Sequence, residues 1–302
     1  MSFRITDAGR TANLQAQIAL SARRVAQTQE QVVTGKRINR PSDDPNRAEA
    51  VLRLRSNQAE LAQYQRTATS VSAKLQSADT TLGHYQELLD RARALLAQGV
   101  TDTATPEARN AVATQLDSLR QQFIQIANTT HNGEYIFGGT RSTVAPFDPA
   151  TGAANAPTAL PPYVQVEPHA TPVVTSVTAG LVFTDTSGTI FTALTNASTA
   201  LRGTGDATAD RAALLSTQSR LGVFTKQANG AQAIIGTNQQ YVEAARERLI
   251  RTNLALEESA QNIEGIDLAE AAIAYSEAQR SREAILQTAA NAGRRSLLDF
   301  LG

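Results

Sequence analysis

The chain has 302 residues, of which 41% are hydrophobic but only 5% aromatic, and its 28 Lys and Arg equal its 28 Asp and Glu. The balanced charge creates no net field that would attract nucleic acid or anionic lipid. The absence of Cys excludes disulfides, thiolate metal sites and cysteine nucleophiles. The sequence contains no run of 18 apolar residues, so we predict no membrane span. It also contains no basic segment followed by an apolar block, so we predict no cleavable signal.

The first predicted helix covers residues 7–34 and carries one apolar stripe. Three of the stripe residues are seven apart, which is typical of a coiled-coil helix. Gly35 is expected to end it, and a polar connector follows. In that connector Asp44 and Pro45 predict an N-cap and a first-turn proline, which would start the next helix. The stripe consists of Leu14, Ile18, Val25 and Val32.

The second predicted helix runs from about residue 45 to Gly99 and carries the longest apolar ladder of the chain. Its two rows have the spacing of the a and d positions of a left-handed coiled coil, and no proline interrupts them. Each Leu sealed in such a seam stabilises the fold by about 1.5–3 kcal/mol, so the ladder requires partner helices. The rows are Leu54, Leu61, Ala68, Leu75, Leu82, Leu89 and Leu96, and Tyr64, Val71, Ala78, Tyr85 and Ala92.

A third predicted helix starts at Thr105-Pro106-Glu107 and is short enough to fold back on the ladder. Asn132-Gly133 then predicts a turn, followed by a short strand at residues 135–137. The apolar positions of this third helix are Val112, Leu116, Leu119, Phe123 and Ile126.

Residues 141–189 differ in composition from the rest of the chain, since Pro, Thr, Gly and Val dominate. Three β-type pieces are predicted within them, at residues 164–166, 173–177 and 181–184. With about 50 residues the segment is too small for a large core of its own. We therefore expect a small β-rich insert within a helical protein.

A helical pattern returns at Ile190, and Gly203 is expected to end this first segment. Asp206 opens a longer helical segment, which Gly265 interrupts. Three glycines within this segment predict a close helix approach or a kink, because each costs about 1 kcal/mol relative to Ala. They are Gly222, Gly230 and Gly236. A second ladder follows them, formed by Ile235, Val242, Leu249, Leu256 and Ile263, and the closing segment carries Ile273, Ile285, Leu297, Leu298, Phe300 and Leu301.

These patterns predict a mainly α fold. It would be an elongated, heptad-patterned helical bundle or coiled coil built from both chain ends, with a small β-rich insert in the middle. The ladder would then be covered within one chain, by the return helix and the second ladder. The predicted intramolecular seam comprises Leu54, Leu61, Leu75, Leu82, Leu89, Leu96, Leu249 and Leu256.

The sequence offers no chemistry for catalysis. Three histidines, His84, His131 and His169, lie in a helix, a turn and a Pro-rich loop, without metal-ligand spacing. Thr34-Gly35-Lys36 lacks the remaining residues of a phosphate-binding loop. No nucleophile and base pair up, so we predict no catalytic, cofactor-binding or metal-binding residue, no cofactor and no enzyme activity.

The connector Thr-Gly-Lys-Arg-Ile-Asn-Arg-Pro-Ser-Asp-Asp-Pro, residues 34–45, resembles the segment that joins the first two helices in the flagellin superfamily. Its Pro-Ser-Asp-Asp-Pro end resembles the branch found at the hook–filament junction. Gly133–Gly139 with Pro146-Phe147, and the closing segment 266–301, are similar to the same branch. The resemblance covers about residues 1–147 and 190–302.

The resemblance implies an extended structural subunit in layers. Residues 1–44 and 263–302 would form a terminal coiled-coil layer, residues 45–140 and 190–262 a helical rod domain, and residues 141–189 the outer insert. The assembly contacts would come from the soft chain ends. The candidate contact residues are Leu14, Ile18, Val25, Val32, Ile273, Ile285, Leu297, Leu298, Phe300 and Leu301.

The function implied is that of an adaptor in the bacterial flagellum, which joins the hook, through a proximal junction protein, to the flagellin filament. Expected partners are further copies of the chain, that junction protein, flagellin and a cytoplasmic export chaperone, but neither nucleic acid nor membrane. Secretion would use the flagellar export apparatus. Two alternatives stay open, namely flagellin itself and an intracellular coiled-coil scaffold.

Overall fold

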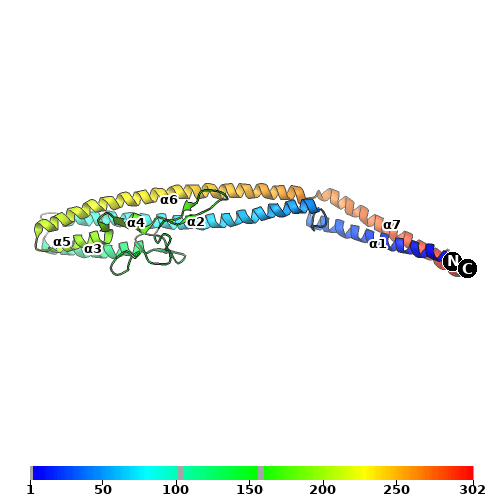
Figure 1. The fold of residues 1–302 in the computed structure, drawn as a ribbon, viewed down its shortest axis with the longest axis horizontal. Helices are drawn as coiled ribbons and strands as arrows, with labels where there is room; N and C mark the ends of the chain where they lie inside the picture. The colour runs from blue at the N-terminus through cyan, green and yellow to red at the C-terminus, as the bar shows by residue number, and fades with distance from the viewer. Residues whose placement is uncertain (1–2, 101–104, 156–159, 302) are drawn as a thin grey trace. The chain divides into compact units, whose positions relative to one another are not determined.

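The computed structural model describes residues 3–100, 105–155 and 160–301, and the side chains of residues 9, 11–100, 105–155 and 160–291 (Figure 1). The fold is mainly α with small antiparallel strand pairs, as predicted. The helices are α1 (Phe3–Thr34), α2 (Pro45–Gly99), α3 (Pro106–Ala127), α4 (Ala179–Phe183), α5 (Ile190–Arg202), α6 (Ala207–Glu264) and α7 (Leu268–Leu301). The strand pairs are β1 (Thr130–His131) with β2 (Glu134–Tyr135), β3 (Tyr163–Val164) with β4 (Val173–Val174), and β5 (Thr184–Asp185) with β6 (Gly188–Thr189).

Local signals set the helix ends, and the predicted caps are confirmed. The Asp44 carboxylate accepts a hydrogen bond of 3.1 Å from the Arg47 N–H in the first turn of α2. The Thr105 hydroxyl accepts one of 3.3 Å from the Ala108 N–H in α3. Gly35 follows α1 with a φ of +66°, a left-handed conformation that favours glycine.

The chain divides into two compact units. Unit 1 comprises residues 1–60 and 252–302, and unit 2 comprises residues 61–251. This division follows packing, whereas the layers proposed above concern an assembly, so the layer boundaries stay a prediction. In unit 1 the helices α1 and α7 lie side by side and both chain termini lie at the same end of the pair, so the two helices are antiparallel (Figure 1).

Unit 2 holds the main core, formed by α2, α3, α5 and α6, with α3 packed against α5. Residues of both sequence ladders belong to this core, and hydrogen bonds of neighbouring side chains join α2 to α6. Arg93 of α2 donates to the Leu221 carbonyl of α6, and Gln86 donates to Asn229 and Gln232 of α6. Fully buried core residues include Leu75, Leu82, Leu89, Leu116, Leu194, Leu221 and Val242.

Residues 141–189 belong to this core rather than standing apart from it. Phe183, the last residue of α4, is fully buried, and its ring centroid lies 4.8 Å from that of Tyr85 in α2. The rings of Phe137 and Phe147 lie 5.1 and 5.9 Å from it, in edge-to-face geometry that favours aromatic pairs. Segments far apart in the sequence therefore meet at this one side chain.

The predicted strand at residues 181–184 is wrong, because α4 occupies most of it. Val182 and Phe183 are adjacent and both are fully buried. A strand would send consecutive side chains to opposite faces, whereas a helical turn places Ala179, Val182 and Phe183 on one face. The predicted strands 164–166 and 173–177 are shortened to the two-residue strands β3 and β4.

A close helix approach or a kink was predicted at the α6 glycines, and the close approach is wrong. A Cβ atom added at Gly230 or Gly236 would meet no atom within 4 Å, and one added at Gly222 would touch only the Arg93 guanidinium, at 3.9 Å. The helix α6 continues through all three glycines. Within this chain they cost helix stability without allowing tighter packing.

Replacing Gly230 with Ala is therefore expected to stabilise the protein by about 0.8–1 kcal/mol, because the new methyl group meets open space and the unfolded chain loses freedom. Urea denaturation followed by circular dichroism measures the change. Gly138→Ala is the matched control, since its Cβ would lie 2.9 Å from the Arg141 carbonyl oxygen and should destabilise. Equal effects of the two substitutions would contradict the prediction.

Candidate assembly surface

The structure describes the side chains of six of the ten candidate contact residues. On α1, Val25 is buried, and Leu14, Ile18 and Val32 are half-buried. On α7, Ile285 is half-buried and Ile273 is 60% exposed. The side chains of Leu297, Leu298, Phe300 and Leu301 lie outside the described residues.

The face that α1 and α7 bury is made of small residues and one Val. Ser21 and Val25 are buried on α1, and Ala271 and Ala278 on α7. Small side chains allow the two helix axes to approach closely, but they bury little apolar area. The pair is consequently weakly held by its own seam.

Besides the candidate Ile273, four other apolar side chains of the pair are exposed and were not among the candidates. Leu20 follows Ile18 by two residues, which is about 200° around the helix, and therefore lies off the predicted stripe. Ile273 follows the buried Ala271 in the same way. An apolar residue one or two positions after a stripe or buried residue is thus the sequence signal for exposed apolar surface. We call the exposed set the outer apolar set: Leu20, Val33, Leu268, Ile273 and Leu286.

A polar clasp closes one end of the α1–α7 pair. Glu264, the last residue of α6, is 8% exposed, and its carboxylate lies 2.9 Å from the Lys36 ammonium and 2.6 Å from the Arg55 guanidinium. The Arg37 N–H donates to the Glu264 carbonyl at 2.7 Å, and the Ile266 N–H donates to the Gly35 carbonyl at 3.3 Å. The residues around the end of α6, Glu264 and Ile266, are therefore hydrogen-bonded to the connector that follows α1. Sequence reasoning missed this contact.

The two neighbouring aspartates of the connector have separate tasks. Asp44 caps α2, as described above. The Asp43 carboxylate accepts the N–H groups of Asn39 and Arg40, at 3.0 and 2.9 Å. The Asn39 amide in turn donates to the Lys36 carbonyl at 3.1 Å. Both carboxylates thus shape the connector, and neither is arranged for acid–base chemistry.

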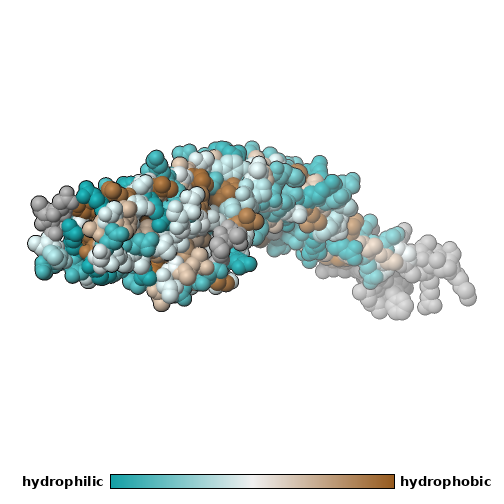
Figure 2. Space-filling view, turned by 60° about the vertical axis from the view of Figure 1, so that its left-hand side comes forward, coloured by the Kyte–Doolittle hydropathy of each residue, from teal (hydrophilic) through white to brown (hydrophobic). Residues whose placement is uncertain are grey.

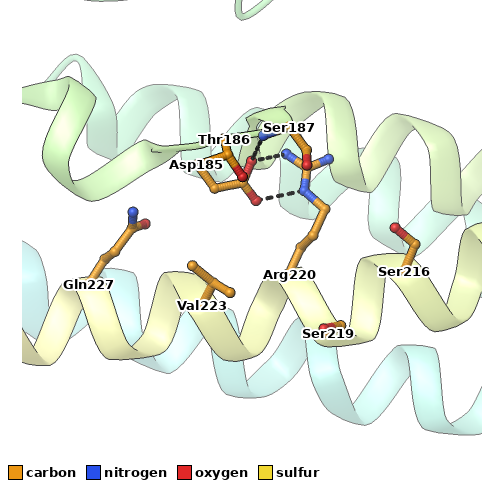
Figure 3. Close-up of a pocket in the computed structure, with 8 residues that line it drawn as sticks. All are labelled: Asp185, Thr186, Ser187, Ser216, Ser219, Arg220, Val223 and Gln227. Carbon is orange, nitrogen blue, oxygen red and sulfur yellow. Dashed lines mark hydrogen bonds and ion pairs between the residues drawn. The ribbon is translucent and has the colours of Figure 1, made fainter.

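In unit 2, a pocket lies between the β5–β6 turn and α6 (Figure 3). The Arg220 guanidinium reaches across it and donates two hydrogen bonds, of 2.7 and 2.9 Å, to the Asp185 carboxylate. It also donates to the Thr189 carbonyl at 3.1 Å. Beside it, the Gln227 amide donates to the Thr184 carbonyl at 3.0 Å. The ion pair and hydrogen bonds across the pocket therefore connect the insert to α6.

The ionic form of Asp185 is favoured by its surroundings. Burial raises the pKa of the carboxyl group, but the hydrogen bonds and charge of Arg220, with the N–H groups of Ser187 and Gly188, outweigh it and hold the pKa below the ordinary value. A carboxyl group with a depressed pKa contributes stability above its unfolded value, about 3.9, which is lost as pH falls through the folded value. The ion pair between Asp185 and Arg220 therefore weakens in acid.

Asp185→Asn is expected to destabilise unit 2 by about 2–3 kcal/mol at pH 7, because it leaves the nearly buried Arg220 charge without its partner. The loss of stability between about pH 5 and pH 2 should become shallower than in the unsubstituted chain. Denaturant midpoints measured across this range test both effects. Asp90→Asn, which removes an exposed carboxylate from α2, should leave the loss of stability in acid unchanged.

Further ion pairs fasten the rest of the insert region. Glu167 accepts two hydrogen bonds from Arg248 of α6, at 2.8 and 2.9 Å, and these raise the pKa of Arg248. Lys74 of α2 lies 2.9 Å from Glu134, and this hydrogen bond with its charge lowers the pKa of Glu134. The visible face of the molecule is accordingly mixed, with apolar patches separated by hydrophilic ones (Figure 2).

The described residues also limit other kinds of site. They contain no group of three or more His, Asp or Glu side chains placed to hold a metal ion. Among the same residues, none of the helices combines the length and apolar character that a membrane span requires.

Comparison with known proteins finds similarity over the N-terminal part of the chain. Residues 5–142 match the family described as the bacterial flagellin N-terminal helical region. Flagellar hook-associated protein 3 of Salmonella typhimurium is 36% identical over 124 residues, which are 41% of this chain and 39% of that protein. Flagellin B of Helicobacter pylori is 30% identical over 143 residues, 47% of this chain and 28% of that protein. The matches thus span about two fifths or less of the relatives' length.

Solved structures share the fold at lower identity. A candidate flagellar hook-associated protein from Vibrio parahaemolyticus is 18% identical, with a TM-score of 0.68 over 74% of this chain and 100% of that chain. FlgL of Xanthomonas campestris is 16% identical, with a TM-score of 0.61 over 68% of this chain and 98% of that chain. At these identities the likeness concerns the fold alone. Residues 5–142 of this chain are therefore similar to the N-terminal helical region of bacterial flagellins.

Proposed function

We propose that this protein is a structural subunit of the bacterial flagellum, an adaptor that joins the hook to the flagellin filament. The observation that carries the proposal is the 36% identity to flagellar hook-associated protein 3, against 30% to Flagellin B. The connector and helix start at residues 34–45 lie inside the matched N-terminal region. The fold shared with hook-associated proteins supports the same choice.

The features of unit 1 suit this role. An adaptor needs surface that is left open in one subunit and covered by its neighbours, and the outer apolar set provides such surface on α1 and α7. The partners we propose are further copies of the chain, the proximal junction protein, flagellin and an export chaperone. The candidate contact residues of α1 and α7, including the four near the C-terminus, stay part of the proposal.

The proposal includes secretion through the flagellar export apparatus and a location at the hook–filament junction. It assigns the chain no enzymatic activity and no cofactor. The contacts that bring Asp, Glu and Arg side chains together are fastenings between helices, connector and insert, such as those of Glu264 and Asp185. A purely structural task accounts for them.

Deleting the gene from its bacterium tests the function. We expect cells that keep their hooks, lack filaments and release flagellin into the medium, and that regain motility when the chain is supplied again. Antibodies carrying gold should mark a single band between hook and filament in electron micrographs. Motile deletion cells with filaments attached would refute the proposal.

The second candidate is flagellin itself, which the 30% identity to Flagellin B favours. It predicts label along the whole filament, and long filaments formed by the purified protein alone. A coiled-coil scaffold inside the cell predicts that the protein stays in the cell body when flagella are sheared off. The gold labelling and the shearing therefore separate the three roles.

A further inference from the structure

The α1–α7 seam repeats along its length, so it does not by itself fix how the two helices are aligned. The antiparallel bridge between Lys36 and Gly265 anchors one end of the pair. Beyond that end, steps of seven residues back along α1 from Val32 and forward along α7 from Ala271 place apolar residues at matching positions. The matching positions are Val32 and Ala271, Val25 and Ala278, and Ile18 and Ile285.

A slip of one heptad would keep this pattern almost unchanged. Val25 would then face Ile285 or Ala271, which are also apolar, and the small residues of the seam would accept either neighbour. The free-energy difference between the two alignments is correspondingly small for the apolar contacts. Some group that occurs once along the pair has to distinguish them.

The clasp at Glu264 is such a group. Its carboxylate is nearly buried and receives one cation from the connector, Lys36, and one from α2, Arg55. The residues seven positions before and after Lys36 are Gln29 and Asp43, and neither carries a positive charge. A slipped α1 would leave Glu264 with one cation fewer, or would bring a second carboxylate towards it.

We infer that the Glu264 clasp sets the register of the α1–α7 pair, through two ion pairs to one nearly buried carboxylate, whose value lies in specificity more than in stability. Buried polar groups fix register in coiled coils by the same mechanism, since a wrong alignment leaves them unpaired. The backbone bonds between the connector and the break after α6 hold only in the aligned state. The inference concerns the fold of unit 1 and does not depend on the flagellar role.

The chain has no Cys, so engineered disulfides report the register directly. The aligned pair is Val25→Cys with Ala278→Cys, and the slipped pair is Val25→Cys with Ile285→Cys. Oxidation is applied to the purified full chain and to cells that produce it, and crosslinks are quantified by gel and mass spectrometry. With Glu264 present we expect the aligned disulfide to dominate.

Glu264→Gln keeps the shape of the side chain and removes its charge. We expect the ratio of aligned to slipped disulfide to fall about tenfold, because the ion pairs no longer penalise the slipped state. Lys36→Gln combined with Arg55→Gln should produce the same shift while Glu264 stays in place. Glu257→Gln, an exposed carboxylate of α6 with no ion pair among the described residues, serves as the control and should leave the ratio unchanged.

The inference is overturned if both charge variants keep the original ratio. It is also overturned if neither disulfide forms in the unsubstituted background, or if the variants lose both disulfides, because the clasp would then hold the helices together without selecting their alignment. Circular dichroism on the same samples checks that the helices of unit 2 remain folded.

Discussion

Replacing Phe183 with Ala is expected to destabilise unit 2 by about 3–5 kcal/mol, a large part of the stability of an ordinary domain. The Phe183 ring is fully buried and touches Tyr85, Phe137 and Phe147 in edge-to-face contacts. Removing it leaves a cavity between α2 and the insert that a rigid helical core cannot fill. Urea denaturation measured by circular dichroism gives the change in free energy of unfolding.

Two further variants show whether the effect comes from the buried cluster. Tyr163→Ala removes an aromatic ring that is 62% exposed in β3, and should cost less than about 0.5 kcal/mol. Tyr85→Phe keeps the ring but loses the hydrogen bond that its hydroxyl donates to the Val182 carbonyl, at a cost of about 1 kcal/mol. If Phe183→Ala is as mild as Tyr163→Ala, the insert does not share the core of the helices.

The parts of the fold that local sequence determines were predictable. Asp44 and Thr105 cap their helices because each satisfies N–H groups within the next turn, a requirement visible within four residues. The mainly α class follows from heptad rows that extend over many turns. The burial of Leu75, Leu82 and Leu89 supports the proposed seam, while Leu54 and Leu256 are only half-buried.

The errors arise where distant residues decide the local structure. Residues 181–184 have strand-forming side chains, but the aromatic cluster requires Val182 and Phe183 on one face and so selects a helical turn. In the clasp, Glu264 pairs with Lys36 and Arg55, each of which lies more than 200 positions away in the sequence. No spacing rule connects residues so far apart. In the outer apolar set only Ile273 was among the candidates, whereas the other four residues lie off the predicted stripes and were therefore not selected.

Replacing Ile273 with Asp is expected to prevent incorporation of the subunit while leaving the free chain folded. Ile273 is 60% exposed on α7, and an Asp there would meet water in the free chain. Covered by a neighbouring subunit it would lose up to about 1.5–3 kcal/mol of apolar burial and add the cost of an unpaired buried charge. A subunit array repeats this cost at every contact, so motility should be lost.

Swimming assays and gold labelling of cells that carry the substituted gene measure the outcome, and circular dichroism of the purified variant checks folding. Gln279→Asp is the matched control, because it adds the same charge to the same helix at an exposed polar position and removes no apolar surface. Leu298→Asp is expected to act like Ile273→Asp if the closing residues of the chain also form contacts. Normal swimming with Ile273→Asp would remove α7 from the assembly surface, because an exposed apolar side chain that tolerates a carboxylate is not covered in the assembled state.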